Sequence, residues 1–321
     1  MKGTSRICAR IFTLSCALSS VLGATYSLSD NIVGTGFYNS FNFEAIPDPT
    51  AGRVNYVDQA TAQSLNLTFA SADTFILRAD DTTVISDSSS VGRNSVRIRT
   101  NNAYTTHVAV FDMVHMPQGC GTWPAVWETN ESNWPAGGEV DIVEGVNDQG
   151  TDQVTLHTSP GCEMPATGRT MTGTALDLDC DTSVNGNAGC GVSVGQAPSF
   201  GPTFNADGGG WYAIERTTTF INVFFWSRQA TNVPADVVAG GSSVDTSNWG
   251  TPVANFPNTD CNIAEFFDGN NIIINLTFCG DWAGAVYATS GCPSTCESYV
   301  DANPTAFVDA YFQFTSINIY T

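Results

Sequence analysis

Short stretches of β-prone sequence, bounded by turn residues, recur along the whole chain. In "NSVRIRT", residues 94–100, apolar and basic residues alternate, as in a strand with one buried face. "INVFFW" and "NIIINLTF" are apolar almost throughout and predict strands that are buried on both faces. Long apolar patterns with the 3.6-residue period of a helix are absent from the sequence. The predicted strands include Thr74–Ala79, Ser95–Thr100, Thr105–Val114, Glu139–Val143, Gln153–His157, Tyr212–Thr217, Phe220–Phe225, Asn271–Phe278 and Tyr311–Tyr320.

Many short strands with frequent turns predict an all-β protein, a sandwich or jelly roll of antiparallel sheets. Short helices are expected within residues 257–268 and 296–309. Residues 160–210 are rich in Gly, Cys and Pro and predict a long loop held by disulfides. Neither an internal repeat nor a linker-like change in composition is visible, so we expect one domain over residues 24–321.

The N-terminus predicts a secretory signal peptide at residues 1–23. Three basic residues within the first ten precede an apolar stretch at residues 11–21, and small residues follow at Gly23 and Ala24. That stretch is shorter than the ~20 apolar residues needed to span a bilayer. We therefore expect a secreted, extracellular protein without a membrane partner.

Cysteine usage agrees with secretion. Eight of the ten cysteines lie after the predicted signal, and an even number in a secreted chain predicts up to four disulfides. The sequence leaves their pairing open. Cys292 and Cys296 are spaced four apart, but there is no Cys-x-x-Cys pair and no histidine near them, so we expect no metal site. The eight are Cys120, Cys162, Cys180, Cys190, Cys261, Cys279, Cys292 and Cys296.

The formal net charge of −20 excludes several kinds of partner. Removal of the three basic signal residues makes it about −23 and leaves eight arginines and no lysine. Such a chain repels phosphate backbones and anionic membranes, so nucleic acid is not an expected partner. We expect a monomer with a neutral, polar ligand.

Three sequons have the form Asn-x-Ser/Thr and are candidate glycosylation sites: Asn66, Asn130 and Asn275. Asn275 lies in an apolar run, so we rank it below Asn66.

A separate match, "GVSVG" around Ser193, resembles a nucleophile elbow, which requires a helix after the serine. "QAPSFGP" follows instead, and no histidine comes later in the chain, so we interpret this segment as a loop.

"GGEVDIVEGVND", residues 137–148, places three acids within six β-prone residues. Strand alternation puts Glu139 and Asp141 on one face and Glu144 on the other. In one interpretation, the first two face solvent and Glu144 begins a turn. In the other, a β-bulge near residues 142–143 returns Glu144 to the face of Glu139. The three carboxylates would then line one cleft.

The second interpretation has a chemical purpose, because glycoside hydrolysis uses two carboxyl groups in different protonation states. One attacks the sugar or activates water, and the other donates a proton to the leaving oxygen. A negative neighbour raises the pKa of one member, so that it stays protonated.

Tryptophans near the acids favour a sugar-binding cleft, because flat aromatic faces suit the C–H faces of sugar rings. Trp127 and Trp134 lie among polar residues, and Trp282 lies in the loop "CGDWAG". For Trp123, core and cleft placements stay open. Trp211, Trp226 and Trp249 are expected to be structural.

"GEVDIVEG" resembles the bulged, laminarinase-type motif of glycoside hydrolase family 16. The blocks "DPTAGRVNYVDQATA", "GRNSVRIR", "HMPQGCGTWPAVWET" and "NIIINLTFCGDWAG" are similar to those of secreted fungal endo-β-glucanases of that type. The resemblance covers essentially all of residues 24–321. It implies a concanavalin-like β-jelly-roll sandwich with a concave, open-ended cleft.

The resemblance also implies a function, retaining endo-hydrolysis of β-1,3-glucan and mixed β-1,3/1,4-glucan. It assigns Glu139 as nucleophile, Glu144 as general acid/base and Asp141 as the acid that orients the nucleophile. It places Arg97, Trp127, Trp134 and His157 at the sugar subsites, although His157 could equally be a plain strand-end residue. A structural calcium ion is frequent in the family, but no calcium-loop motif is visible here and no cofactor is expected. A glucan transglycosylase and a glucan-binding lectin-like protein are the alternatives.

Overall fold

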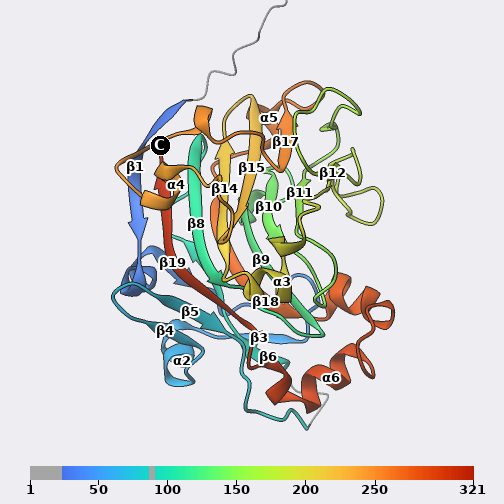
Figure 1. Ribbon diagram of the computed structural model, residues 1–321. Coiled ribbons are helices and arrows are strands. Elements are labelled where there is room, and N and C mark those ends of the chain that lie inside the picture. The colour runs from blue at the N-terminus through green and yellow to red at the C-terminus, as the bar shows by residue number, and fades with distance from the viewer. Residues whose placement is uncertain (1–23, 87–90) are drawn as a thin grey trace, which may run out of the picture.

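The computed structural model describes residues 24–86 and 91–321, so the predicted signal peptide at 1–23 lies outside the described residues. Two large antiparallel sheets pack face to face as the layers of a sandwich (Figure 1). The first sheet runs in the order β16 (Ser243–Asp245), β1 (Thr25–Ile32), β19 (Tyr311–Tyr320), β8 (His107–His115), β14 (Gly210–Arg216), β15 (Phe220–Ser227) and β17 (Ala254–Pro257), with β5 (Phe75–Arg78) on β19 and β4 (Thr68–Ala70) on β5.

The second sheet carries the acidic motif in its central part. Its order is β12 (Thr174–Ala175), β13 (Val192–Ser193), β11 (Gln153–His157), β10 (Glu139–Glu144), β9 (Thr122–Thr129), β18 (Asn271–Phe278), β7 (Arg97–Thr100) and β2 (Phe41–Phe43). A small parallel pair, β3 (Val54–Tyr56) with β6 (Arg93–Ser95), lies apart from both sheets. The expected jelly-roll sandwich of antiparallel sheets is therefore confirmed.

Helices are short and peripheral. In the part of the chain that the structure describes, no helix has the length and apolar character needed to cross a bilayer. Two of them, α5 and α6, fall where the sequence predicts short helices. The helices are α1 (Phe37–Ser40), α2 (Gln59–Ser64), α3 (Gly201–Ala206), α4 (Ala235–Ala239), α5 (Ile263–Phe266) and α6 (Cys296–Ala302).

The main core fills the space between the two sheets. On β14, Tyr212 and Ile214 point into this core, whereas Trp211 points to the outer face of the first sheet. There it packs with Trp226 and Trp249 under the segment around α4. The three tryptophans expected to be structural are all buried, with exposed fractions of 4–7%.

The sequence missed β9, although β18 and β19 have the predicted bounds. Its cleft-side residues include two tryptophans, and its inward residues include Glu128, which is fully buried. Glu128 is balanced in the interior by His107 Nε2 at 2.8 Å and Arg216 at 3.2 Å. On this strand apolar residues lie on both faces, with Val126 in the core and Trp123 and Trp127 in the cleft, and an acid is buried among them, so the alternation that predicts a half-buried strand is absent.

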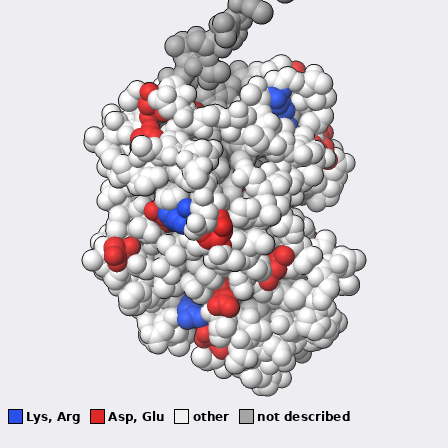
Figure 2. All heavy atoms as spheres, in the orientation of Figure 1, with Lys and Arg blue, Asp and Glu red and all other residues white. Residues whose placement is uncertain are grey.

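All eight cysteines after the predicted signal form disulfides, as expected. Cys180–Cys190 closes a short loop within residues 160–210, and Cys162 ties the same region to Cys261. The pairs are Cys120–Cys292, Cys162–Cys261, Cys180–Cys190 and Cys279–Cys296. On the face shown in Figure 2, charged side chains are few and scattered over a mostly uncharged surface.

Candidate active site

The predicted β-bulge is present in β10. Asp141 pairs with Trp127 of β9, but Val143 already pairs with Val126, so two steps along β10 correspond to one along β9. Glu144 then pairs with Ala125. Trp127 and Ala125 both line the cleft, which places Glu144 on the same face as Asp141.

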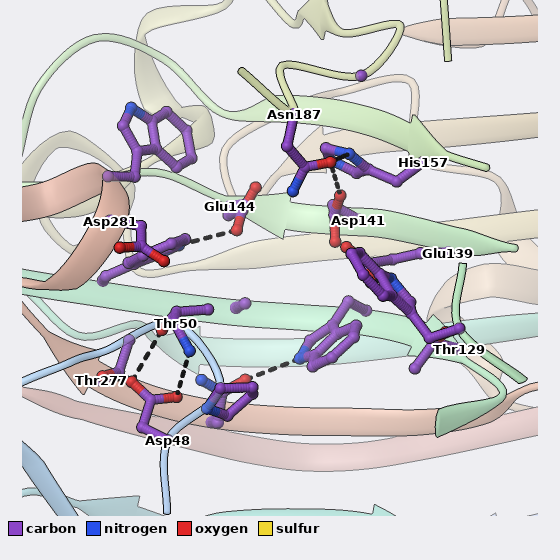
Figure 3. Close-up of a pocket in the computed structure, with 18 of the residues that line it drawn as sticks. Asp48, Thr50, Thr129, Glu139, Asp141, Glu144, His157, Asn187, Thr277 and Asp281 are labelled. Atoms are coloured by element: carbon purple, nitrogen blue, oxygen red, sulfur yellow. Dashed lines mark hydrogen bonds and ion pairs between the residues drawn. The ribbon is translucent and has the colours of Figure 1, made fainter. Parts of the chain in front are cut away.

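The second sheet forms the floor of a cleft of about 930 Å³. Glu139, Asp141 and Glu144 lie side by side along β10 in its middle (Figure 3). Loops that carry Trp134, Asn187 and Trp282 form parts of its walls.

Glu139 accepts a hydrogen bond from the indole of Trp134, with 2.7 Å between Nε1 and Oε2. Burial and the Asp141 charge raise the pKa of Glu139 to about 7. His157, the Trp134 hydrogen bond and Arg97 act in the opposite direction. Two cations therefore favour the ionised form of this carboxyl.

Glu144 accepts a hydrogen bond from Trp123, with 2.8 Å between Nε1 and Oε1. Burial, followed by the Asp141 charge, raises the pKa of Glu144 well above its usual range. The Trp123 hydrogen bond and His157 oppose this shift, and Glu139 adds to it. Because Arg97 counters only the shift of Glu139, the electrostatics favour a proton on Glu144 and a charge on Glu139.

His157 lies beside the acids at the end of β11. Its Nε2 is 3.4 Å from Asp141 Oδ2, and its Nδ1–H donates to Asn187 Oδ1 over 2.9 Å. Burial alone would lower the pKa of His157, but the contact with Asp141 and the two glutamates raise it to about 10. The imidazolium thus offsets part of the negative charge of the cleft floor.

Glu139, Asp141 and His157 are close enough to resemble a metal site, since one ligand atom of each lies within 4.8 Å of the others. A histidine binds a metal only through a neutral ring nitrogen. The neighbouring acids raise the pKa of His157, so a metal ion would have to displace a proton from its ring.

Arg97 lies in the cleft wall, but the residue is only 2% exposed. It pairs with Glu44 at 2.8 Å and Glu131 at 2.5 Å, and lies 5.0 Å from the ring of Trp127. Arg97 therefore supports Trp127 from behind. Its sequence neighbours Val96, which directly precedes β7, and Ile98, on β7, are fully buried in the core, as the alternation predicts.

The three sequons differ in exposure. Asn66 is exposed and Asn130 is partly buried, with Nδ2 donating to Asp268 over 3.2 Å. Asn275 stays the weakest of the three predicted glycan sites, because the residue is only 6% exposed and both ends of its side chain are hydrogen-bonded. Its Nδ2, the atom that would carry the glycan, donates to Tyr56, and its Oδ1 accepts from Trp127.

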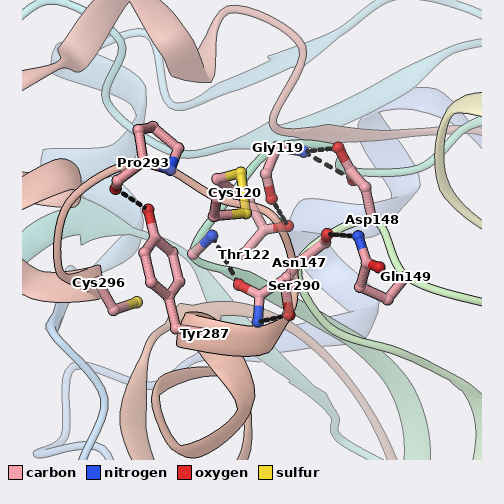
Figure 4. Close-up of a disulfide and its surroundings, with 12 residues drawn as sticks. Gly119, Cys120, Thr122, Asn147, Asp148, Gln149, Tyr287, Ser290, Pro293 and Cys296 are labelled. Carbon is pink, nitrogen blue, oxygen red and sulfur yellow. Dashed lines mark hydrogen bonds between the residues drawn. A yellow bond between two sulfur atoms is a disulfide. The ribbon is translucent and has the colours of Figure 1, made fainter.

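Trp282 lines the cleft from the segment after β18 and meets Trp123 edge to face, with ring centroids 5.8 Å apart. The Cys120–Cys292 disulfide holds this region against the start of β9 (Figure 4). Asn147, three residues after Glu144, bonds to both sides, to Gly121 N and Ala283 O at 2.8 Å each.

Sequence reasoning left three contacts undetected. Trp123 was left open between core and cleft, and it bonds Glu144. Asn187 lies in the loop closed by the Cys180–Cys190 disulfide and bonds to His157. Asn275 lies among apolar residues on β18 and bonds to Trp127. The expectation of a loop around Ser193 is wrong, because Ser193 lies in β13 and "QAPSFGP" contains a 3₁₀ helix at Ala197–Ser199 and the first residues of α3.

Comparison with known proteins gives consistent relatives. A family model described as "XgeA-like, catalytic GH16 domain" matches residues 41–320. A probable glycosidase of Schizosaccharomyces pombe is 42% identical over 92% of this chain and 69% of its own length. A probable endo-1,3(4)-β-glucanase of Aspergillus fumigatus is 41% identical over 95% of this chain, which spans about half (47%) of that relative.

Solved structures show the same fold. Laminarinase 16A from Phanerochaete chrysosporium, with 6-O-glucosyl-laminaritriose in donor and acceptor sites, has a TM-score of 0.91 and 60% identity, covering 93% of this chain and 100% of that one. An elongating family 16 β-1,3-glucosyltransferase has a TM-score of 0.85 and 36% identity, covering 92% of this chain and 100% of that one.

Proposed function

The chain belongs to glycoside hydrolase family 16, and on this premise we propose that it is a retaining endo-hydrolase of β-1,3-glucan and mixed β-1,3/1,4-glucan. The single observation that carries the proposal is the bulge in β10, because it gathers Glu139, Asp141 and Glu144 on the floor of one open cleft. The relatives named endo-1,3(4)-β-glucanase and laminarinase support the choice of a β-glucan.

In the proposed first step, the Glu139 carboxylate attacks the anomeric carbon while Glu144 gives its proton to the glycosidic oxygen. The bond from the anomeric carbon to the leaving sugar breaks, and a glycosyl ester of Glu139 forms. In the second step, Glu144 takes a proton from water as the water oxygen attacks the same carbon. The ester bond breaks, Glu139 leaves as a carboxylate, and the original configuration is restored.

The electrostatics of the site support these roles. The neighbouring cations favour charge on Glu139, and Glu144 keeps its proton because burial and Asp141 both oppose ionisation. Trp127, Trp134 and Trp282 are proposed as the faces on which the sugar rings pack. The four disulfides support secretion, and we propose an extracellular, monomeric enzyme.

A glucosyltransferase is the second candidate, favoured by the 36% identical elongating enzyme. The two differ in the acceptor, a sugar hydroxyl in place of water. A pure lectin is disfavoured, because binding alone gives no reason to bury three facing acids.

The test is product analysis on laminarin, lichenan and cellulose, with the anomeric configuration followed by NMR from the first turnover. We expect laminarin and lichenan to be cut internally with β-configured products appearing first, and Glu139→Ala to abolish the reaction while binding survives. Asp73→Asn, an exposed acid outside the cleft, is the matched control. Products longer than the supplied oligosaccharide would favour the transferase, and no cleavage of any β-glucan would favour the lectin.

A further inference from the structure

Beyond Asp141, β10 separates from β11. The β10–β11 ladder ends where Asp141 pairs with Thr155. Continued in the same register, it would bring Glu144 opposite Asp152. Instead, the backbone N–H of Glu144 donates a hydrogen bond of 2.8 Å to Oδ1 of the Asp152 side chain. A carboxyl group thus supplies the acceptor that a backbone carbonyl supplies in a regular ladder.

Asp152 is itself fully buried and held in place. Its backbone N–H donates to Ser199 Oγ over 3.0 Å, and its carbonyl accepts from Val194 N over 2.9 Å. Its second carboxyl oxygen, Oδ2, is buried without a hydrogen-bond partner. Burial raises the pKa of Asp152 well above its usual range, so the group suits the neutral acid form.

We propose that Asp152 is a positioning residue for Glu144, holding the strand beyond the bulge so that the Glu144 carboxyl stays on the cleft face. The inference rests on the proposed function, because it assigns a task to Asp152 only if Glu144 transfers the proton. Asp152 lines no part of the cleft that holds the acids and acts through the Glu144 backbone.

The packing explains why one acceptor matters. Gly145, the next residue, lies against the ring of Phe200, where a Cβ would come within 2.6 Å of a ring atom. The backbone there is enclosed, so a Glu144 N–H without Asp152 would be buried without a partner, which costs about 1–3 kcal/mol in proteins. Relaxation toward regular alternation, which turns Glu144 away from Glu139, is one way to relieve that cost.

The test compares two substrates in each variant. Laminarin needs a proton on its leaving oxygen, whereas an aryl β-oligoglucoside with a dinitrophenolate leaving group does not. In Asp152→Ala and Asp152→Ser, which remove the acceptor at Glu144 N, we expect kcat on laminarin to fall ~10–100-fold, part of the ~10²–10⁴ that general acid catalysis supplies. The aryl substrate should change by less than ~3-fold in the formation of the glycosyl ester, and KM should stay similar.

Asp152→Asn is the conservative variant that should keep the activity. Its amide oxygen can accept the hydrogen bond from the Glu144 N–H, and its side chain is neutral, like the protonated acid. We expect its rate on laminarin within ~3-fold of wild type and an unchanged pH profile. Asp80→Ala is the matched control, because Asp80 is 8% exposed and accepts backbone N–H groups of Thr82 and Thr83 outside the cleft. Its loss should lower the melting temperature and leave the ratio of the two substrate rates unchanged.

Equal losses on both substrates, or full laminarin activity in a folded Asp152→Ala, would overturn the proposal. If neither acceptor-free variant folds while Asp152→Asn does, Asp152 is required for folding, and the positioning role is also rejected. The variant Glu144→Ala distinguishes a failure of the proposed function from a failure of the role proposed for Asp152. If Glu144→Ala hydrolyses laminarin normally, the proposed function fails, whatever the Asp152 variants do.

Discussion

Glu139 and Glu144 lie on the same face of β10, although they are five positions apart in the sequence, and each accepts an indole N–H from a different tryptophan. The bulge adds one residue to β10 relative to β9, so both side chains point into the cleft. Each carboxyl accepts a hydrogen bond from its own tryptophan. Each acid therefore has its own indole donor, although Asp141 and His157 act on both, and a change at one indole should mainly alter one limb of the pH profile.

Trp134→Phe should move the acidic limb of kcat/KM to higher pH. The Trp134 hydrogen bond lowers the pKa of Glu139, which must be ionised to attack, and Phe keeps a ring but removes the donor. A hydrogen bond to a charged group contributes ~1.5–3 kcal/mol, or about 1–2 pH units, and because Trp134 is 46% exposed we expect a shift at the lower end, about one unit. A pH series of initial rates on laminarin measures it; a shift of the basic limb alone would contradict the assignment.

Trp123→Phe is the matched opposite. Its hydrogen bond lowers the pKa of Glu144, so its removal raises that pKa. Glu144 must be protonated to act as the acid, and activity should therefore persist to higher pH, with the acidic limb unchanged. A pH series of initial rates on laminarin measures this change. An unaltered basic limb would contradict the assignment of Glu144 as the general acid.

Asp141→Asn should move both limbs to lower pH. The charge of Asp141 raises the pKa of Glu139 and of Glu144, and Asn removes that charge with little change in size. The expected displacement is on the order of one pH unit for like charges in contact. kcat should also fall, because His157 loses its carboxylate partner. A profile that keeps its position would show that Asp141 is not coupled to the pair.

Glu139→Gln should be more stable than the wild type at neutral pH. The folded-state pKa of Glu139 is about 7 against its usual 4.5, so protonation favours folding. The wild type therefore loses stability as pH rises from about 4.5 to about 7, and glutamine does not. Thermal melts across this range should show a gap that grows with pH by about 2 °C or more. A constant gap would contradict the shift.

Glu128→Gln should destabilise the fold without touching the cleft. The pKa of the buried Glu128 is lowered, since His107 and Arg216 more than offset its burial. Removal of its charge leaves Arg216 unpaired in the core, which costs about 3–5 kcal/mol for buried pairs. Denaturant unfolding at pH 7 measures this loss, which should shrink as pH falls through the lowered pKa. Asp81→Asn, in a partly exposed pair with Arg78, is the control, with an effect below ~1 kcal/mol.

The sequence by itself predicted the all-β class, the bounds of β18 and β19, and the need for a bulge between Asp141 and Glu144. These follow from local patterns, because alternation and turn residues act over a few neighbours. β9 stayed hidden, since the partners that make Glu128 tolerable in the core come from β8 and β14. The pairing of the cysteines and the burial of Asn275 also stayed open, because both depend on residues that are distant in the sequence.

The sequence alone thus predicted which acids to expect in the cleft, and the tertiary structure decided which neighbours shift the pKa of each glutamate. The acids are adjacent in the chain, whereas Arg97, Asn187 and Asp152 reach them from other elements. Protonation depends on burial and on charges close in space, and neither quantity is encoded in spacing along the chain. The fold thus raises the pKa of both glutamates through burial and Asp141, and it gives the two carboxyls, which the sequence presents as alike, different hydrogen-bond donors and different neighbours.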